Sequence, residues 1–171
     1  VSNNIIKNAG VVSGYKAEDY SYGAITITSP SSPDANHLIQ YNQIDSCVYN
    51  GIQFRGAGVQ VKNNYINYPC LLRGDGGGIY TGFANEEGKV IDGNIVLNSI
   101  GNRNGIKSGS GSDAHGIYID DLGNNMTITN NTIAGCSNSG LFLHNTKNIT
   151  VRNNNIYDNG GNDYTKGQIF I

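Results

Sequence analysis

The chain has 171 residues and a formal net charge of −2, with 24 glycines, abundant asparagine, 14% charged residues and no tryptophan. Its length predicts one domain with a buried core. The near-neutral charge gives no reason to expect nucleic acid or an anionic membrane as a partner, and no apolar run approaches the ~20 residues of a membrane helix. Because glycine and asparagine form turns well and helices poorly, the composition also disfavours a helical protein.

A six-residue template recurs along the chain: an aliphatic residue, two mostly polar residues, Asn, any residue, and a second aliphatic residue. Its asparagines are Asn4, Asn42, Asn64, Asn94, Asn131 and Asn154. The shortest step, from Asn42 to Asn64, is 22 residues, and the longer steps contain insertions. A repeat of this length indicates a solenoid. A leucine-rich repeat has a similar period, but its Leu-rich consensus is absent.

A second aliphatic segment follows each of these asparagines and is typical of a β-strand. The six segments are 23–27, 51–54, 78–81, 116–119, 140–143 and 167–171. Six coils, each with at least two strands, predict an all-β, right-handed, single-stranded parallel β-helix that spans residues 1–171 as one domain. We expect the aliphatic residues to stack in columns. We also expect the six asparagines to hydrogen-bond along the axis, at a corner where they adopt the left-handed backbone conformation.

Both ends of the chain lie in mid-strand, without a polar cap. Uncapped solenoid ends expose strand edges and core residues. We therefore interpret the chain as an excised part of a longer β-helix, with the rest of that helix as its partner at both ends.

Two further groups of residues are interpreted as structural. Cys47, Cys70 and Cys136 fit neither a zinc spacing nor a dense disulfide framework, so we expect packed free thiols. Glu86 and Glu87 are consecutive in a short loop, which is typical of a solvated turn.

Insertions and outward-facing residues gather on one side of the predicted helix. The insertions 8–22, 83–89 and 99–112 interrupt the repeat where loops usually wall a binding groove, with neutral surface loops as the alternative. Alignment of the second strands on their glycines predicts two outward columns. One contains Gln53, Tyr80, Tyr118 and Phe142, and the next contains Arg55, Gly82, Asp120 and His144.

Aromatic rings flanked by carboxylates, Arg and His are typical of a surface that binds a sugar chain. The two histidines could orient a substrate or act as bases, or they could be hydrogen-bonded structural groups. The candidate substrate-binding residues are Arg55, Tyr80, His115, Tyr118, Phe142 and His144.

The stretch 113–121, Asp-Ala-His-Gly-Ile-Tyr-Ile-Asp-Asp, is the densest group of chemically active side chains, and residues 75–80 repeat its Asp-x-x-Gly-Ile-Tyr pattern. Glycoside hydrolysis uses two carboxyl groups, and neighbouring carboxylates keep one of them protonated as an acid. The candidate catalytic residues are Asp75, Asp113, Asp120 and Asp121, each of which could instead be a turn residue. We predict no metal or other cofactor. An Asp cluster is compatible with Ca²⁺, but the sequence has no consensus calcium loop.

These two segments resemble the core of right-handed β-helix carbohydrate-active enzymes, most closely β-helix glycoside hydrolases with fucosidase, xylanase and xylosidase activities. In those enzymes a Gly-(Gly/Ala)-Ile-Tyr-Thr segment preceded by Asp and a Gly-Ile-Tyr-Leu-Asp-Asp segment line the active site; this chain has Ile119 in place of Leu. The resemblance covers residues 60–160. It implies that Asp75 and either Asp120 or Asp121 are the catalytic carboxyls, with Asp113 as a further candidate. Asp75 and Asp120 flank the aromatic column, so they meet only if residues 74–78 curl back.

The sequence therefore favours a glycoside hydrolase that acts on a polysaccharide or oligosaccharide, outside the cell or at its surface. One alternative is a polysaccharide lyase for a uronic-acid polymer, which needs a basic residue and a charge-neutralising cation; Arg55, Arg73 and Lys107 are available. The other is a non-catalytic carbohydrate-binding, adhesion or tailspike solenoid, in which the paired Asp motifs are coincidental.

Overall fold

The computed structural model describes residues 1–12, 23–28, 36–82, 86–102, 114–160 and 167–171. These residues form seventeen short β-strands. None of the described residues belongs to a helix long and apolar enough to cross a membrane.

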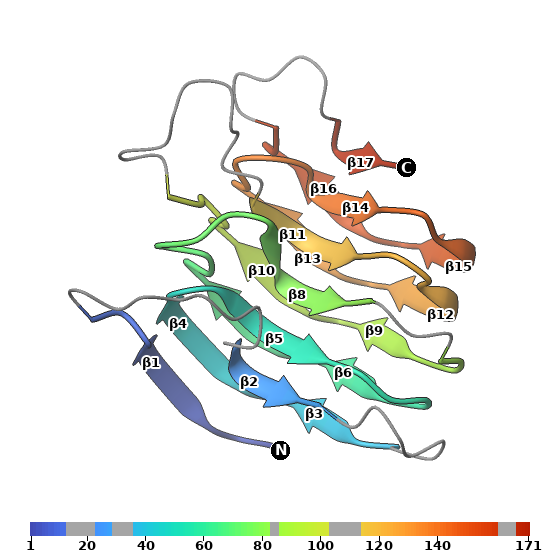
Figure 1. The fold of residues 1–171 in the computed structure, drawn as a ribbon, viewed down its shortest axis with the longest axis horizontal. Helices are drawn as coiled ribbons and strands as arrows, with labels where there is room; N and C mark the ends of the chain where they lie inside the picture. The colour runs from blue at the N-terminus through green and yellow to red at the C-terminus, as the bar shows by residue number, and fades with distance from the viewer. Residues whose placement is uncertain (13–22, 29–35, 83–85, 103–113, 161–166) are drawn as a thin grey trace.

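The strands form three parallel sheets that run the length of the molecule (Figure 1). Sheet 1 contains β3 (Leu38–Gln40), β6 (Gln60–Lys62), β9 (Val90–Asp92), β12 (Asn124–Thr129) and β15 (Lys147–Arg152). Sheet 2 contains β1 (Ile5–Ala9), β4 (Gln43–Cys47), β7 (Tyr65–Asn67), β10 (Ile95–Leu97), β13 (Thr132–Ala134) and β16 (Asn155–Tyr157). Sheet 3 contains β2 (Gly23–Ile27), β5 (Asn50–Phe54), β8 (Gly76–Thr81), β11 (Ala114–Ile119), β14 (Leu141–Leu143) and β17 (Ile169–Phe170). The chain thus winds through six coils, as the sequence predicts.

The recurring template spans the corner between sheet 1 and sheet 2. In the third coil, Val61 of sheet 1 aligns with Ile39 below and Ile91 above. After the corner, Ile66 of sheet 2 continues the second aliphatic column in the same way. These residues are fully buried. The predicted columns are therefore confirmed. The six-residue template spans two strands of each coil, because the strands on either side of the sharp corner can be as short as three residues.

The six template asparagines form a hydrogen-bonded ladder along this corner. Nδ2 of each donates to Oδ1 of the asparagine in the next coil over 2.9–3.0 Å, from Asn4 up to Asn154. The backbone N–H of the same residue donates to that Oδ1 as well. In the interior, Nδ2 also reaches backbone carbonyls, as when Asn64 donates to Lys62 and Ile39. The predicted structural role of the six asparagines is confirmed.

The left-handed backbone at this corner belongs to the residue before each ladder asparagine, so the prediction that the ladder asparagines adopt it is wrong. Positive φ angles of 52° to 68° occur at Asn3, Tyr41, Asn63, Gly93, Asn130 and Asn153. The preceding residue turns the chain, which leaves the ladder residue oriented to bond the coils on either side. Asparagine is frequent at the turning position too, because it tolerates this conformation better than most residues.

The three cysteines are free and buried inside the helix. Burial raises the pKa of Cys47 and of Cys136 to about 12. Burial also raises the pKa of Cys70 well above its ordinary value. The thiols therefore stay protonated and unreactive, which confirms that they are packed free thiols.

The middle of the ladder should contribute more to stability than its end. Asn94 is fully buried and bonded on both sides, so Asn94→Ala leaves buried polar groups unpaired. We expect it to lower the free energy of unfolding by about 2–5 kcal/mol, since each such group costs about 1–3 kcal/mol. Asn4→Ala, at the exposed end, should cost less than about 1 kcal/mol. Urea unfolding followed by circular dichroism compares the two variants; equal losses would contradict this account.

Candidate functional site

The first of the two predicted columns lies on the outward face of sheet 3. Gln53 aligns with Tyr80, Tyr80 with Tyr118, and Tyr118 with Phe142, so the first predicted column is confirmed. The second column follows directly after the strands. There the N–H of Asp120 donates to Thr81 O and that of His144 to Ile119 O, which sets these two residues one coil apart.

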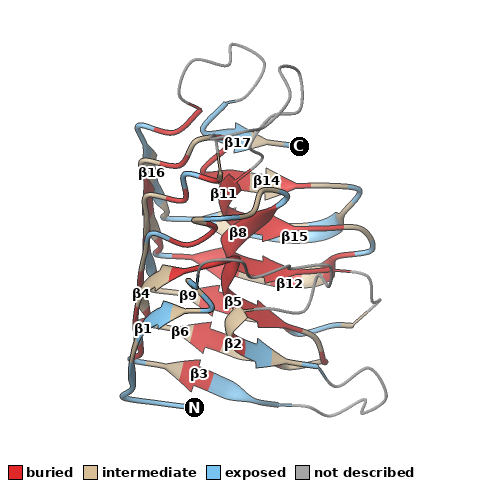
Figure 2. Cartoon of the chain, turned by 60° about the vertical axis from the view of Figure 1, so that its left-hand side comes forward, coloured by how far each residue is buried: buried red, intermediate tan, exposed pale blue. Residues whose placement is uncertain are grey.

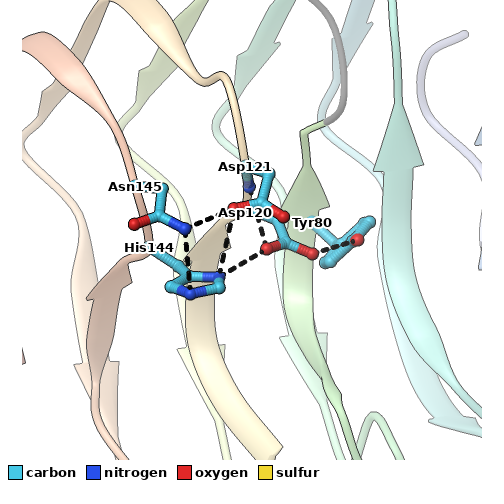
Figure 3. Close-up of polar contacts among 5 residues, drawn as sticks. All are labelled: Tyr80, Asp120, Asp121, His144 and Asn145. Atoms are coloured by element: carbon cyan, nitrogen blue, oxygen red, sulfur yellow. Dashed lines mark hydrogen bonds and ion pairs between the residues drawn. The ribbon is translucent and has the colours of Figure 1, made fainter.

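Asp120, Asp121 and His144 form a compact cluster at this position (Figure 3). Asp120 Oδ1 lies 2.9 Å from His144 Nδ1 and accepts the Asp121 N–H at 2.8 Å. Asp120 Oδ2 accepts the Tyr80 hydroxyl at 2.7 Å. Asp121 Oδ1 accepts from Asn145 Nδ2 at 2.7 Å and lies 3.6 Å from His144 Nδ1. One oxygen or nitrogen from each member of the cluster lies within 4.8 Å of the others.

Asp120 is buried, with a side chain only 9% exposed, yet it is held in its ionised form. Burial acts to raise its pKa, but hydrogen bonds from His144, Tyr80, the Asp121 N–H and Tyr118 outweigh burial and lower that pKa below its ordinary value. Burial and the nearby Asp120 charge raise the pKa of Tyr80 and of Tyr118, so both phenols stay protonated as donors. To bond a carboxylate, His144 Nδ1 must carry a proton.

The other two members of the cluster are open to a ligand. The side chains of Asp121 and His144 are 39% and 43% exposed. Nε2 of His144 lies 3.3 Å from Asn145 Nδ2 and makes no contact with a carboxylate among the described residues. The cluster therefore combines one buried, fixed charge with a carboxyl and an imidazole that solvent reaches.

Gly82 makes room for Asp120. It follows β8 one coil below, and a Cβ at this position would lie 2.6 Å from the Cβ of Asp120 and 3.0 Å from its Cα. Any side chain there would push the carboxylate out of its hydrogen bonds. Arg55 follows β5 at the equivalent position and is half-buried. The second predicted column is thus confirmed, and its glycine has a steric role.

The aromatic residues stack on one another. The rings of Tyr118 and Phe142 are 4.8 Å apart, those of Phe142 and Phe170 are 5.0 Å apart, and His115 lies 4.7 Å from Phe142. Tyr80, Tyr118 and His115 are buried, whereas Phe142 and Phe170 are half-buried. Only the last two therefore offer much surface to a ligand. In the sequence, alignment of the last strand on Gly167 places Ile169 in this column. In the structure the strand is shifted by one residue, and Phe170 pairs with Phe142.

Asp75 and the cluster lie at opposite ends of the strands of sheet 3, Asp75 before a strand begins and the cluster after the strands end. Asp75 is exposed, immediately precedes β8 and has a φ of 56°, whereas Asp120 follows β11, the neighbour of β8 in the sheet. Its charge contributes to the raised pKa of Tyr118, but Asp75 is not part of the cluster. Pairing of Ala114 with Gly76 makes Asp113 the equivalent of Asp75 in the next coil; Asp113 itself lies outside the described residues.

A second charged pair lies next to this column, and the interpretation of Glu86 as solvated is wrong. Glu86 Oε2 forms an ion pair with Lys89 Nζ at 2.9 Å, and the two side chains are 15% and 0% exposed. Lys89 also donates to Thr81 Oγ1 at 3.2 Å. Burial lowers the pKa of Lys89, and the Glu86 carboxylate opposes that change. The three-residue spacing of Glu86 and Lys89 in the sequence could have indicated this ion pair, since a buried lysine needs a partner of opposite charge.

The cluster does not fit Ca²⁺. This ion takes about six to eight oxygen ligands, whereas the cluster offers two carboxylates and an imidazole. Both oxygens of Asp120 already accept hydrogen bonds. A softer divalent ion would suit the ligand types better, but it would have to displace the bond between His144 and Asp120.

The buried charge of Asp120 predicts a pH-dependent contribution to stability. Its pKa is lowered on folding, so ionised Asp120 stabilises the fold above the unfolded value of about 3.9, and this contribution is lost as the pH falls through the folded pKa. The difference in Tm between the unmodified chain and Asp120→Asn should therefore be large at neutral pH and shrink in acid. Asp121→Asn, on an exposed side chain, is the control and should show a smaller difference at neutral pH. A difference for Asp120→Asn that does not change with pH would contradict the assignment.

Comparison with known proteins identifies the family. A family model described as a right-handed beta helix region matches residues 1–168, which include strands of all six coils. No curated protein and no solved structure matches the chain. The match agrees with the three parallel sheets, and the chain belongs to the right-handed β-helix family.

Proposed function

We propose that the chain is a glycoside hydrolase that cleaves a polysaccharide or oligosaccharide at Asp120, Asp121 and His144. The observation that carries the proposal is the convergence of two carboxyl groups and an imidazole within 4.8 Å on one outward face of the helix. Cleavage of a glycosidic bond needs a group that protonates the leaving oxygen and a carboxylate that acts on the other side. The cluster contains both kinds of group.

His144 is the proposed general acid. The buried carboxylate of Asp120 orients the ring through a hydrogen bond from Nδ1. In the imidazolium form, Nε2 carries the second proton, which it donates to the glycosidic oxygen as the bond from that oxygen to the anomeric carbon breaks. Asp120 is thus a positioning residue, because Tyr80, His144 and the Asp121 N–H already occupy its oxygens.

Asp121 is the proposed nucleophile. One of its oxygens lies within 4.8 Å of a His144 ring nitrogen, a separation closer to the ~5 Å of retaining enzymes than to the ~6.5–9.5 Å that leaves room for an attacking water. Its carboxylate is 39% exposed and anchored by Asn145, so it can bond to the anomeric carbon as the leaving group departs. A water molecule then attacks that carbon and breaks its bond to Asp121, while His144 Nε2 takes a proton from the water. One water molecule is consumed, and both groups regain their starting protonation.

A chain-like substrate suits the last coils of this face. The outward side chains of Gln53, Tyr80 and Tyr118 are buried, whereas Phe142 and Phe170 are half-buried and lie in successive coils, with 5.0 Å between their ring centres. Half-buried Phe142 adjoins His144, with 5.4 Å between ring centres, and could contact a sugar ring beside the reaction centre. Half-buried Arg55 and exposed Asp75, which adjoin strands of the same sheet, are further proposed substrate contacts. A polymeric substrate also favours action outside the cell.

A variant in which an uncharged amide replaces the Asp121 carboxylate tests the proposal. The chain is incubated with a library of polysaccharides and oligosaccharides, and new reducing ends are measured. We expect cleavage of at least one glycan, and a loss of at least about 10²-fold in kcat for Asp121→Asn, because the amide cannot bond to the anomeric carbon. Asp158→Asn, which removes the same charge from an exposed residue after β16, is the matched control and should keep full activity.

Other outcomes separate the alternatives. New absorbance at the ultraviolet alkene band with a uronate polymer, without hydrolysis, would identify a lyase. Glycan binding without turnover would identify a binding solenoid. Full activity in Asp121→Asn would overturn the assignment of the nucleophile.

A further inference from the structure

Two exposed tyrosines occupy backbone positions that suit other residue types. At each of the two corners that flank sheet 2, one residue of every coil has a positive φ. Ten of these twelve residues are Asn, Gly, Ser or Asp, and the other two are Tyr41 and Tyr68, with φ angles of 53° and 52°. A bulky side chain is uncommon in this conformation, because its Cβ crowds the following carbonyl oxygen.

Packing does not offset this strain at either tyrosine. Tyr41 is 55% exposed and Tyr68 is 40% exposed, so neither ring is part of the core. Asparagine, the usual residue at these corners, tolerates the backbone conformation better. The stability of the fold therefore does not account for the two rings.

A third tyrosine lies between them on sheet 2. Tyr41 precedes β4 by two residues, Tyr65 begins β7 in the next coil, and Tyr68 directly follows β7. Half-buried Tyr65 pairs with exposed Gln43 on one side and with Ile95, which is 41% exposed, on the other. Sheet 2 forms the left side of the molecule in Figure 2, where its strands alternate between buried and more exposed residues. The three rings thus follow one another across two adjacent coils.

Polar groups lie beside these rings. In β7, Tyr65 and Asn67 face outward, because Ile66 between them is fully buried. Asn67 Oδ1 accepts from Asn98 Nδ2 of the next coil at 2.9 Å. Asp45 pairs with Asn67 on the other side, and its negative charge disfavours an anionic ligand such as a nucleic acid or a uronate polymer.

We propose that Tyr41, Tyr65 and Tyr68, here called the tyrosine platform, bind an uncharged sugar chain. Tyrosine rings stack on the apolar faces of pyranoses, while amide and hydroxyl groups beside them bond the sugar hydroxyls. A sugar chain is favoured over a protein, because the rings alternate with polar side chains and do not form the apolar core of a protein interface.

The tyrosine platform is separate from the candidate site. It lies on sheet 2, whereas the cluster at Asp120 follows the strands of sheet 3. The proposal therefore holds whether or not the cluster cleaves a glycan, and a failure of one does not imply a failure of the other.

Affinity gel electrophoresis of the unmodified chain tests the platform. The gels contain xylan, mixed-linkage β-glucan or galactomannan as neutral probes, and polygalacturonate as the charged probe. We expect at least one neutral polysaccharide to retard the chain. In the double variant Tyr41→Asn, Tyr68→Asn, the apparent Kd should rise about tenfold or more. Its Tm should stay the same or rise, because asparagine suits both corners.

Tyr157→Asn is the matched control. Tyr157 is 45% exposed and belongs to β16 of the same sheet, three coils from Tyr65, so this variant should bind like the unmodified chain. Retardation by no neutral polysaccharide, or by polygalacturonate alone, would overturn the proposal. Unchanged affinity in the double variant, or an equal loss in the control, would also overturn it. A lower Tm of the double variant would show that the rings serve the fold, which is equally incompatible with the proposal.

Discussion

Hydrogen bonds between asparagines of successive coils determine how each coil sits on the one below. Each rung joins one side-chain oxygen to a backbone N–H and a side-chain amide of its neighbour, so a coil that slipped by one residue would lose both bonds and would turn its aliphatic residues out of the core. The ladder lies between sheets 1 and 2, yet its effect reaches sheet 3, because the alignment that it fixes also sets Tyr80 beside Tyr118 and Asp120 over Gly82. Insertions of different length between the rungs are tolerated, since the strands that follow them still pair in register with the neighbouring coils.

The candidate site is a product of this alignment and not of any local sequence. Asp120 receives hydrogen bonds from Tyr80, 40 residues earlier, and from His144, 24 residues later. Burial acts to raise the pKa of this carboxyl, and the donors from three coils together outweigh burial and lower it. The bare backbone of Gly82 has the same importance, since it allows the carboxylate to pack close enough to meet all its donors. The carboxylate of Asp120 thus contributes both to the stability of the fold and to the arrangement of the candidate site.

The sequence predicts the features that recur in every coil, and it does not predict those that occur in only one coil. The template asparagines and aliphatic columns recur six times, so their spacing alone predicts the ladder, the coils and the outward alignment of Asp120 with His144. The pattern does not distinguish the residue that turns the chain from the residue that bonds, because asparagine serves both roles at Asn63 and Asn64. Burial of Tyr80 and Tyr118 was not predictable either, since alternation marks a side chain as outward but does not reveal what covers it. The ion pair of Glu86 with Lys89 forms within an insertion, where no second coil offers a comparison.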